Sequence, residues 1–189
     1  NQDGKRKDAI TVRLYADGSE INSESVTAAK GWKYKFTDLP KYRGGNEIKY
    51  TITEDTVEDY NTDINGYDIT NSYTPGKTSI SVLKEWNDAD NQDGKRATSV
   101  KVKLVANGID VTNSEVTLSA DNQWKHTWND LPQKSGGKNI TYTVKETSSI
   151  DGYSAKVTGD AKTGFVVTNS HKPETIDIEG TKTWDDNDN

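Results

Sequence analysis

The chain has 189 residues, a length that suits one large domain or two small domains of about 90 residues each. Hydrophobic residues make up 30% and charged residues 29%, which is polar enough for a disordered chain, but five Trp and nine Tyr at strand-like spacing favour a folded one. The net charge of −6 without a basic stripe argues against a nucleic-acid partner, and no apolar run approaches the ~18 residues that a membrane span needs.

The first half of the chain predicts short strands joined by polar turns. Residues 10–14 (ITVRL) alternate apolar and polar side chains, the period of a half-buried strand, and residues 16–18 (ADG) follow as a hairpin turn. Residues 32–36 (WKYKF), 48–54 (IKYTITE) and 67–73 (YDITNSY) continue the alternation. No stretch predicts a helix longer than one turn.

The second half repeats these elements in the same order, which identifies an internal repeat. The matching segments are 1–18 with 91–108, 32–54 with 124–146, and 67–86 with 165–184. The offset between matching residues grows from 90 to 98, so we expect a longer insertion of the second copy within residues 147–164. Short strands in tandem predict an all-β chain of β-sandwich domains.

The strand alternation places one lysine, one glutamate and one asparagine in phase with apolar residues in each copy. Successive side chains of a strand point to opposite faces, so Lys84 shares a face with Val82, and Asn169 shares one with Val167. By the same rule Glu146, Glu54, Asn71 and Lys182 fall in phase with the apolar positions of their own strands.

Two explanations fit these in-phase polar residues. They can lie at strand ends, where water reaches them, or form a lysine–glutamate ion pair with asparagine as a hydrogen-bond partner. A chemical role fits as well, because burial lowers the pKa of a lysine and raises that of a glutamate. A neutral amine can attack an asparagine carboxamide, release ammonia and leave an amide cross-link, while the carboxyl group relays protons.

The combined motifs resemble a known family. The K-x-W strand, the NQDGKR turn, the W-K-…-DLP strand, the Y-T-x-x-E strand and the closing TNS are similar to the CnaB-type B-repeat domains of staphylococcal-type collagen adhesins, over essentially the whole chain. The resemblance implies tandem inverse immunoglobulin-like β-sandwiches with spontaneous Lys–Asn isopeptide bonds. It implies that Lys84 bonds Asn169 with Glu146 as helper acid, and that Glu54 and Asn71 are the first-domain equivalents.

The phase of the repeats predicts the domain organisation. We expect a first B-type domain at 1–74 that lacks its own leading strand, and a complete second domain at 77–171. Residues 174–189 would be the leading strand of a following domain, one that can be donated to another molecule's first domain by strand complementation. In that exchange Lys182 of one copy would meet Asn71 of another.

The resemblance implies a stalk or spacer repeat of a cell-wall-anchored, extracellular surface protein. The repeats would be stabilised by their own cross-links, and would project a ligand-binding region that lies elsewhere and contacts a host matrix ligand. No signal peptide or wall-sorting signal is visible in this segment. The expected partners are neighbouring repeats, and we expect no turnover enzyme and no cofactor. The alternative is a matrix-protein or calcium-binding adhesive module.

Metal chemistry has weak support in the sequence. The stretch 88–96 (DADNQDGKR) contains NQDG, but an EF-hand register that puts Gly94 at the sixth position places Ala89 at the first and Val100 at the twelfth. His126 and His171 are the only histidines and cysteine is absent, so we expect no zinc site.

Overall fold

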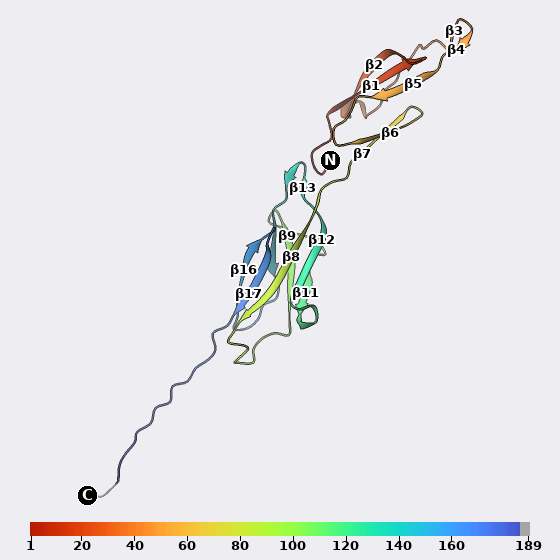
Figure 1. Ribbon diagram of the computed structural model, residues 1–189. Helices are drawn as coiled ribbons and strands as arrows, with labels where there is room; N and C mark the ends of the chain where they lie inside the picture. Colours follow the sequence, from red (N-terminus) through yellow and green to blue (C-terminus); the bar gives the residue numbers. More distant parts are fainter. Residues whose placement is uncertain (186–189) are drawn as a thin grey trace. The chain divides into compact units, whose positions relative to one another are not determined.

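The computed structural model of the protein describes residues 1–185 and is built almost entirely of β-strands (Figure 1). Contacts divide the chain into two compact units. Unit 1 consists of residues 1–77 and 132–139, and unit 2 of residues 78–131 and the chain from residue 140 onward. Between residues 1 and 185 the helical segments are two single 3-10 turns, η1 (Ala28–Lys30) and η2 (Ala120–Asn122), which confirms the all-β prediction.

Unit 1 contains a three-stranded antiparallel sheet and separate hairpins. The sheet has the order β2-β1-β5, and the alternation of β1 buries Val12 and Leu14 against Ile52. The hairpin β6–β7 supplies the residues that match the end of unit 2. The strands are β1 (Ala9–Ala16), β2 (Ser19–Thr27), β3 (Tyr42–Arg43), β4 (Asn46–Glu47), β5 (Tyr50–Glu54), β6 (Asn61–Asn65), β7 (Asp68–Ser72), β13 (Lys134–Ser135) and β14 (Lys138–Asn139).

Unit 2 is a sandwich of two four-stranded sheets. In one sheet β9 pairs with β10, β11 and β15, and in the other the order is β12-β8-β17-β16. Strand β17 runs antiparallel to β16 and parallel to β8. The strands are β8 (Lys77–Asn87), β9 (Ser99–Ala106), β10 (Ile109–Asp110), β11 (Val116–Ser119), β12 (Lys125–Pro132), β15 (Tyr142–Glu146), β16 (Ser154–Asp160) and β17 (Gly164–Ser170).

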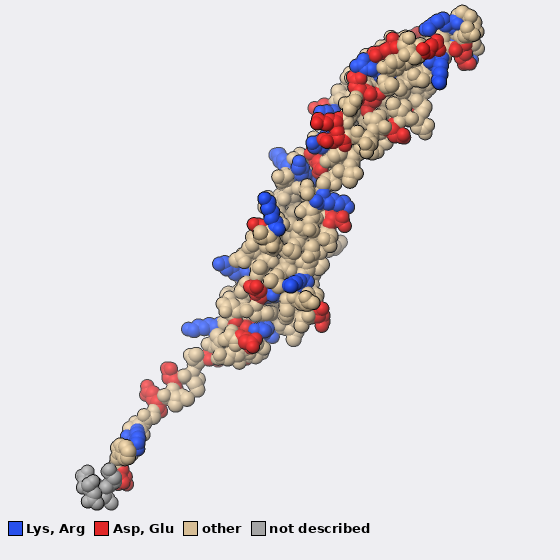
Figure 2. Space-filling view, viewed as in Figure 1, with Lys and Arg blue, Asp and Glu red and all other residues tan. Residues whose placement is uncertain are grey.

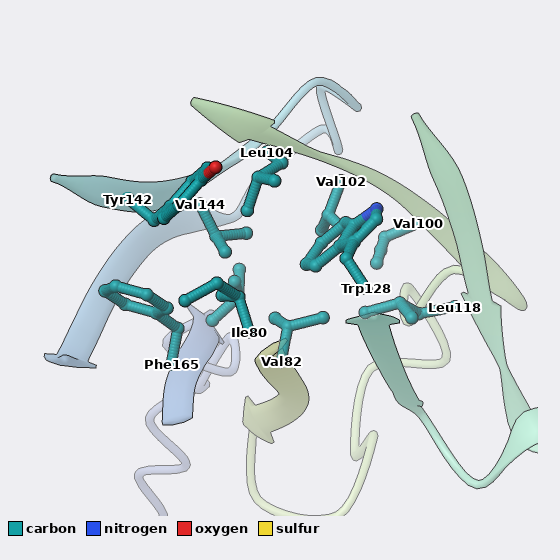
Figure 3. Close-up of a cluster of buried hydrophobic side chains, with 11 residues drawn as sticks. Ile80, Val82, Val100, Val102, Leu104, Leu118, Trp128, Tyr142, Val144 and Phe165 are labelled. Carbon is teal, nitrogen blue, oxygen red and sulfur yellow. The ribbon is translucent and has the colours of Figure 1, made fainter. Parts of the chain in front are cut away.

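The core of unit 2 lies between these two sheets (Figure 3). Alternate side chains of the strands point inward, as the period-2 pattern predicts, and fully burying each large apolar side chain stabilises the fold by about 1.5–3 kcal/mol. The buried residues are Ile80, Val82, Val100, Val102, Leu104, Leu118, Trp128, Tyr142, Val144, Phe165 and Val167.

The predicted hairpin turns are present in both units. Asp17 and Gly18 have φ angles of 52° and 83°, and Asn107 and Gly108 have 50° and 81°. Two successive residues with positive φ make the type I′ turn, whose twist matches the strands that it joins.

The prediction of a strand at residues 32–36 is wrong for unit 1, where this segment is irregular. The two segments begin with the same backbone conformation, since Trp32 and its counterpart Trp124 have similar φ angles of 56° and 60°. In unit 2 the Trp124 carbonyl accepts a 2.8 Å hydrogen bond from the Lys84 amide, and the next residues form β12 beside β8. Within residues 1–77 no strand pairs with 32–36, so its alternation has no ladder to join.

The described part of the segment that we predict to be a leading strand, residues 174–185, has no strand assignment. Its large apolar side chains are exposed: Ile176 is 84% exposed, Ile178 is 87% and Trp184 is 75%. The predicted domain borders and the pairing of this segment stay predictions, and residues 186–189 lie outside the described part of the chain.

Candidate functional site

Strand β8 carries a lysine into the interior of unit 2. Lys84 follows Ile80 and Val82 on the inward face of the strand and is only 3% exposed. Its amine lies 3.8 Å from the centroid of the Trp86 ring and donates a 2.6 Å hydrogen bond to the Glu85 carbonyl oxygen.

Strands β17 and β15 bring a carboxamide and a carboxyl group to the same interior. Asn169 is 2% exposed, and its Nδ2 donates a 3.0 Å hydrogen bond to Glu146 Oε1. Glu146 is half-buried at the end of β15. Within the described residues neither Glu146 Oε2 nor Asn169 Oδ1 has a hydrogen-bond partner, although both atoms are buried. The pair therefore leaves two acceptor atoms unsatisfied in the core, which is costly.

The pairing of β8 with β17 brings the lysine and the asparagine close together. Lys84 lies opposite Val167, and Trp86 lies opposite Asn169. The amine of Lys84 rests on the ring of Trp86, and so it lies over the residue that pairs directly with Asn169. Lys84 and Asn169 thus share the inward face of two neighbouring strands, as the phase of the sequence predicts.

Burial makes the Lys84 amine easier to deprotonate. Desolvation lowers its pKa to about 8, against the opposing effect of the nearby carboxyl groups of Glu146 and Asp88, and the Arg96 guanidinium lowers it further. At a pKa near 8 a substantial fraction of the amine is neutral under mildly basic conditions, and the neutral amine is the nucleophilic form.

Unit 1 repeats the acid and the carboxamide. Asn71 Nδ2 donates to Glu54 Oε1 at 2.9 Å, as Asn169 does to Glu146. The Thr62 hydroxyl lies 2.6 Å from Asn71 Oδ1 and 3.1 Å from Glu54 Oε2. Asn71 is more exposed than its counterpart Asn169, because among residues 1–77 no strand covers the free edge of β7.

A groove of about 390 Å³ opens beside this pair in unit 1. Apolar side chains of β1, β2 and β7 form part of its lining, and Glu54 and Asn71 face it together with the basic residues Arg6 and Lys7. The apolar part of the lining includes Ile10, Val12, Val26 and Ile69.

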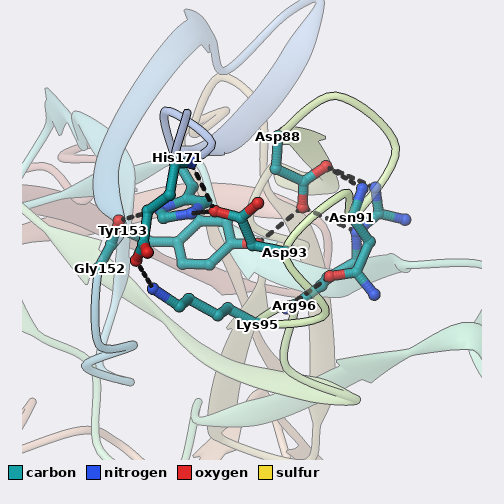
Figure 4. Close-up of polar contacts among 9 residues, drawn as sticks. Asp88, Asn91, Asp93, Lys95, Arg96, Gly152, Tyr153 and His171 are labelled. Carbon is teal, nitrogen blue, oxygen red and sulfur yellow. Dashed lines mark hydrogen bonds and ion pairs between the residues drawn. The ribbon is translucent and has the colours of Figure 1, made fainter. Parts of the chain in front are cut away.

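The loop between β8 and β9 forms a polar network that the sequence pattern does not reveal (Figure 4). Asp88, 2% exposed, accepts two hydrogen bonds from the Arg96 guanidinium, at 2.6 and 2.9 Å, and one of 2.8 Å from the Tyr153 hydroxyl. Asp93 accepts from the Glu174 amide at 2.9 Å and lies 2.9 Å from His171 Nε2. The NQDG motif could have pointed to this loop, but not to its partners.

The same network occupies two of the three carboxyl groups in the loop that the calcium alternative would use, and the third, Asp90, is exposed. Asp88 is held by Arg96, and Asp93 by His171 and the Glu174 amide. Among residues 1–185 no group of three or more acidic or histidine side chains is arranged to hold a metal ion.

Charged side chains of both signs are interspersed on the face that Figure 2 shows. In the part of the chain that the structure describes, no helix has the length and apolar character of a membrane span.

Comparisons with known proteins agree with this fold. The family model described as Cna protein B-type domain matches residues 1–72 and 80–170. The collagen adhesin of Staphylococcus aureus is 49% identical over 189 residues, which is 100% of this chain and 16% of that protein. The chain therefore spans about a sixth of the length of this curated relative.

Two crystal structures of the S. aureus collagen binding protein are similar to the chain. A single B repeat unit (B1) is 46% identical with a TM-score of 0.50, over 92% of each chain. A structure of two B repeat units (B1B2) is 46% identical with a TM-score of 0.52, over 93% of this chain and 47% of that one. The match of the family model over most of both copies, and the identity to an adhesin over the full chain, agree with the sandwich seen in unit 2. The chain belongs to the Cna protein B-type domain family.

Proposed function

We propose that the chain is a structural stalk repeat of a surface adhesin, stabilised in unit 2 by an amide bond between Lys84 and Asn169. The observation that supports the bond most strongly is the burial of Lys84 and Asn169 on neighbouring strands beside the half-buried Glu146, with two buried acceptor atoms unsatisfied. An amide bond would remove the buried charge of Lys84 and the need to solvate it.

The reaction needs only groups of this chain. The neutral Nζ of Lys84 attacks Cγ of Asn169, so that an Nζ–Cγ bond forms and the Cγ–Nδ2 bond breaks. Glu146, which already accepts a hydrogen bond from Nδ2, takes a proton from the attacking amine and delivers it to the departing nitrogen. Ammonia leaves, and the fixed geometry of the folded core supplies a high effective concentration. Each bond forms once, so the chain is no turnover enzyme.

The mass of the intact chain tests the bond. Each amide should lower the mass by about 17 Da, the mass of one ammonia, and Lys84→Ala should remove one such loss. Losing a cross-link that closes a loop of this length should also lower the free energy of unfolding by about 4.5 kcal/mol, measured by chemical denaturation.

Two further variants make the test specific. Lys156→Ala removes an exposed lysine of β16 in the same sheet and should leave the mass loss unchanged. Asn169→Asp should release water in place of ammonia, so that the loss becomes about 18 Da. A loss of 17 Da that persists in Lys84→Ala would show that the assignment is wrong.

The repeat and its relatives support the stalk role. Two copies of one domain in tandem, with a mixed-charge surface, suit a spacer on the extracellular side of the cell wall, and the curated relative is named as an adhesin. The matrix ligand would then be bound by another region. The alternative, a module that grips matrix protein itself, predicts saturable collagen binding by this chain, which surface plasmon resonance on immobilised collagen would detect.

The groove of unit 1 favours a second function, acceptance of a strand from another copy of the chain. Residues 176–184 match the β8 segment 78–86, with Lys182 at the position of Lys84 and Trp184 at that of Trp86. This segment has exposed apolar side chains and two acidic residues, and the groove offers an apolar lining with two basic residues, Arg6 and Lys7, beside the acidic Glu54 and Asp68. We propose that it docks along β7 of a second copy, where Lys182 would meet Asn71 and Glu54.

Two complementary variants test this exchange. A Lys182→Ala chain can only accept a strand, and an Asn71→Ala chain can only donate one in a covalent exchange. The mixture should give a covalent dimer on denaturing gels, whereas each variant alone should stay monomeric and the unaltered chain should give a ladder. A mixture that runs only as monomer would exclude the covalent exchange.

A further inference from the structure

The Lys84 amine has a second layer of residues behind it that the proposed reaction does not use. The Trp86 ring, on which the amine rests, packs edge-on against Trp124 at 5.5 Å and against Tyr153 at 5.3 Å. Its indole N–H is buried without a hydrogen-bond partner among the described residues, so the ring is held by packing alone. Contacts that hold Tyr153 in place therefore also hold the Trp86 ring on which the Lys84 amine rests.

Tyr153 is fixed by the buried carboxyl group of Asp88. The Tyr153 hydroxyl donates to Asp88 Oδ2, and Arg96 donates to both oxygens of the same carboxyl group. The Arg96 guanidinium also lies 5.8 Å from the centroid of the Trp86 ring. The loop between β8 and β9 thus closes a frame around Trp86, part of which is visible in Figure 4.

This frame holds one anion and one cation close to the reactive amine. Asp88 carries a side chain that is 1% exposed and accepts a fourth hydrogen bond, of 3.0 Å, from the Asn91 amide. An unpaired carboxylate so deeply buried would attract the ammonium form of Lys84 and hold it unreactive. The guanidinium of Arg96 donates to both oxygens of the Asp88 carboxylate and so neutralises its charge.

We propose that the buried Asp88–Arg96 pair is a positioning and tuning element for the cross-linking reaction, which holds Trp86 under the Lys84 amine and keeps that amine reactive. This inference rests on the proposed amide bond. Four charged groups act on the pKa of Lys84: Glu146 from β15, Asp88 and Arg96 from the loop, and Glu85, the next residue of its own strand. Of these four, only Asp88 and Arg96 form an ion pair with each other, so that either member can be removed separately.

Asp88 and Arg96 have opposite effects on the pKa of the Lys84 amine. This gives a test that separates an electrostatic effect on the amine from a purely structural role of the pair. Asp88 raises the pKa of Lys84 and Arg96 lowers it. Arg96→Gln should move the midpoint of the pH–rate profile of bond formation upward, and Asp88→Asn should move it downward. Both variants break the same ion pair, so a purely structural role would slow the reaction in both without moving the midpoints apart.

The experiment follows the full chain isolated in denaturant before it has folded, with intact mass confirming that no ammonia has been lost. Refolding is started by dilution at pH values from 5 to 10, aliquots are quenched in acid, and the fraction lighter by about 17 Da is measured. We expect the rate to rise through about pH 8 in the unaltered chain, in line with the pKa of Lys84. Below the midpoint, a displacement of one pH unit changes the rate about tenfold.

Controls distinguish failure of this inference from failure of the bond itself. No mass loss in the unaltered chain would overturn the proposed bond and the inference with it. A normal loss with unmoved midpoints in both variants would overturn the inference alone. Arg96→Lys keeps the charge and should keep the midpoint, and the Asp88→Asn/Arg96→Gln double variant should lie between the two single variants. Circular dichroism of each variant confirms that it has folded.

Discussion

At the residue scale, the aspartate of each NQDG motif holds the segment that follows one strand, β7 in unit 1 and β17 in unit 2. Asp3 accepts hydrogen bonds from the Tyr73 hydroxyl at 2.7 Å and from the Gly76 amide at 2.9 Å. In unit 2 Asp93 makes the same contacts with His171 and with the Glu174 amide. The partner ring is therefore a tyrosine in one unit and a histidine in the other, and only the histidine changes charge near neutral pH.

This exchange of tyrosine for histidine predicts a pH-dependent stability of unit 2. Hydrogen bonds to Asp93 and then to the Gly152 carbonyl raise the pKa of His171, while desolvation and then the nearby Lys95 oppose the rise. A group whose pKa is raised on folding stabilises the fold fully below its unfolded pKa of about 6.5, and the contribution is lost as pH rises through the folded pKa. His171→Gln should therefore lower the Tm of unit 2 more at pH 5.5 than at pH 8.5, measured by calorimetry.

Unit 1 supplies the matched control. Tyr73→Phe removes the equivalent bond to Asp3, and the Tyr73 hydroxyl, whose pKa is raised above its usual value of 10, stays neutral over this range. Its effect on Tm should be the same at both pH values. Equal effects of the His171 variant at pH 5.5 and pH 8.5 would contradict the prediction.

At the element scale, the strand alternation was sufficient to predict the buried side chains of strands that have a paired neighbour on both sides. It places Lys84 and Asn169 in the core because β8 and β17 are regular and lie within a four-stranded sheet. It fails for residues 32–36, whose pattern equals that of the start of β12 but which have no neighbouring strand among residues 1–77. A periodic sequence specifies which face is buried, and the ladder itself depends on a second segment.

Loops have no such periodicity, so the sequence could not predict which of their side chains are buried or what those side chains contact. The sequence shows Asp88, Asp93 and Arg96 as charged residues of one polar loop. The burial of Asp88, the approach of Tyr153 to Asp88 and that of His171 to Asp93 all depend on residues from a distant part of the chain, which no local pattern predicts. The candidate reactive groups were therefore predictable, and the frame behind them was not.

At the scale of the whole molecule, the proposed bond determines how much of the chain can be stretched. It would join residues 84 and 169, so that residues 85–168 are closed into a loop that tension cannot extend. Pulling on the ends of the full chain should then show no release of this segment, a length of about 300 Å at roughly 3.6 Å per residue. Lys84→Ala should release it, measured by single-molecule force spectroscopy, and release in the unaltered chain would contradict the bond.

The parallel pairing of β8 with β17 has a mechanical consequence of its own. These are the first and last strands of unit 2, and because they run in the same direction, the chain enters the sandwich at one end and leaves at the other. A load applied along the chain acts on the two strands in shear. Their hydrogen bonds must therefore break together and not sequentially from one end. Even before any covalent bond has formed, this topology orients the unit along the line of force.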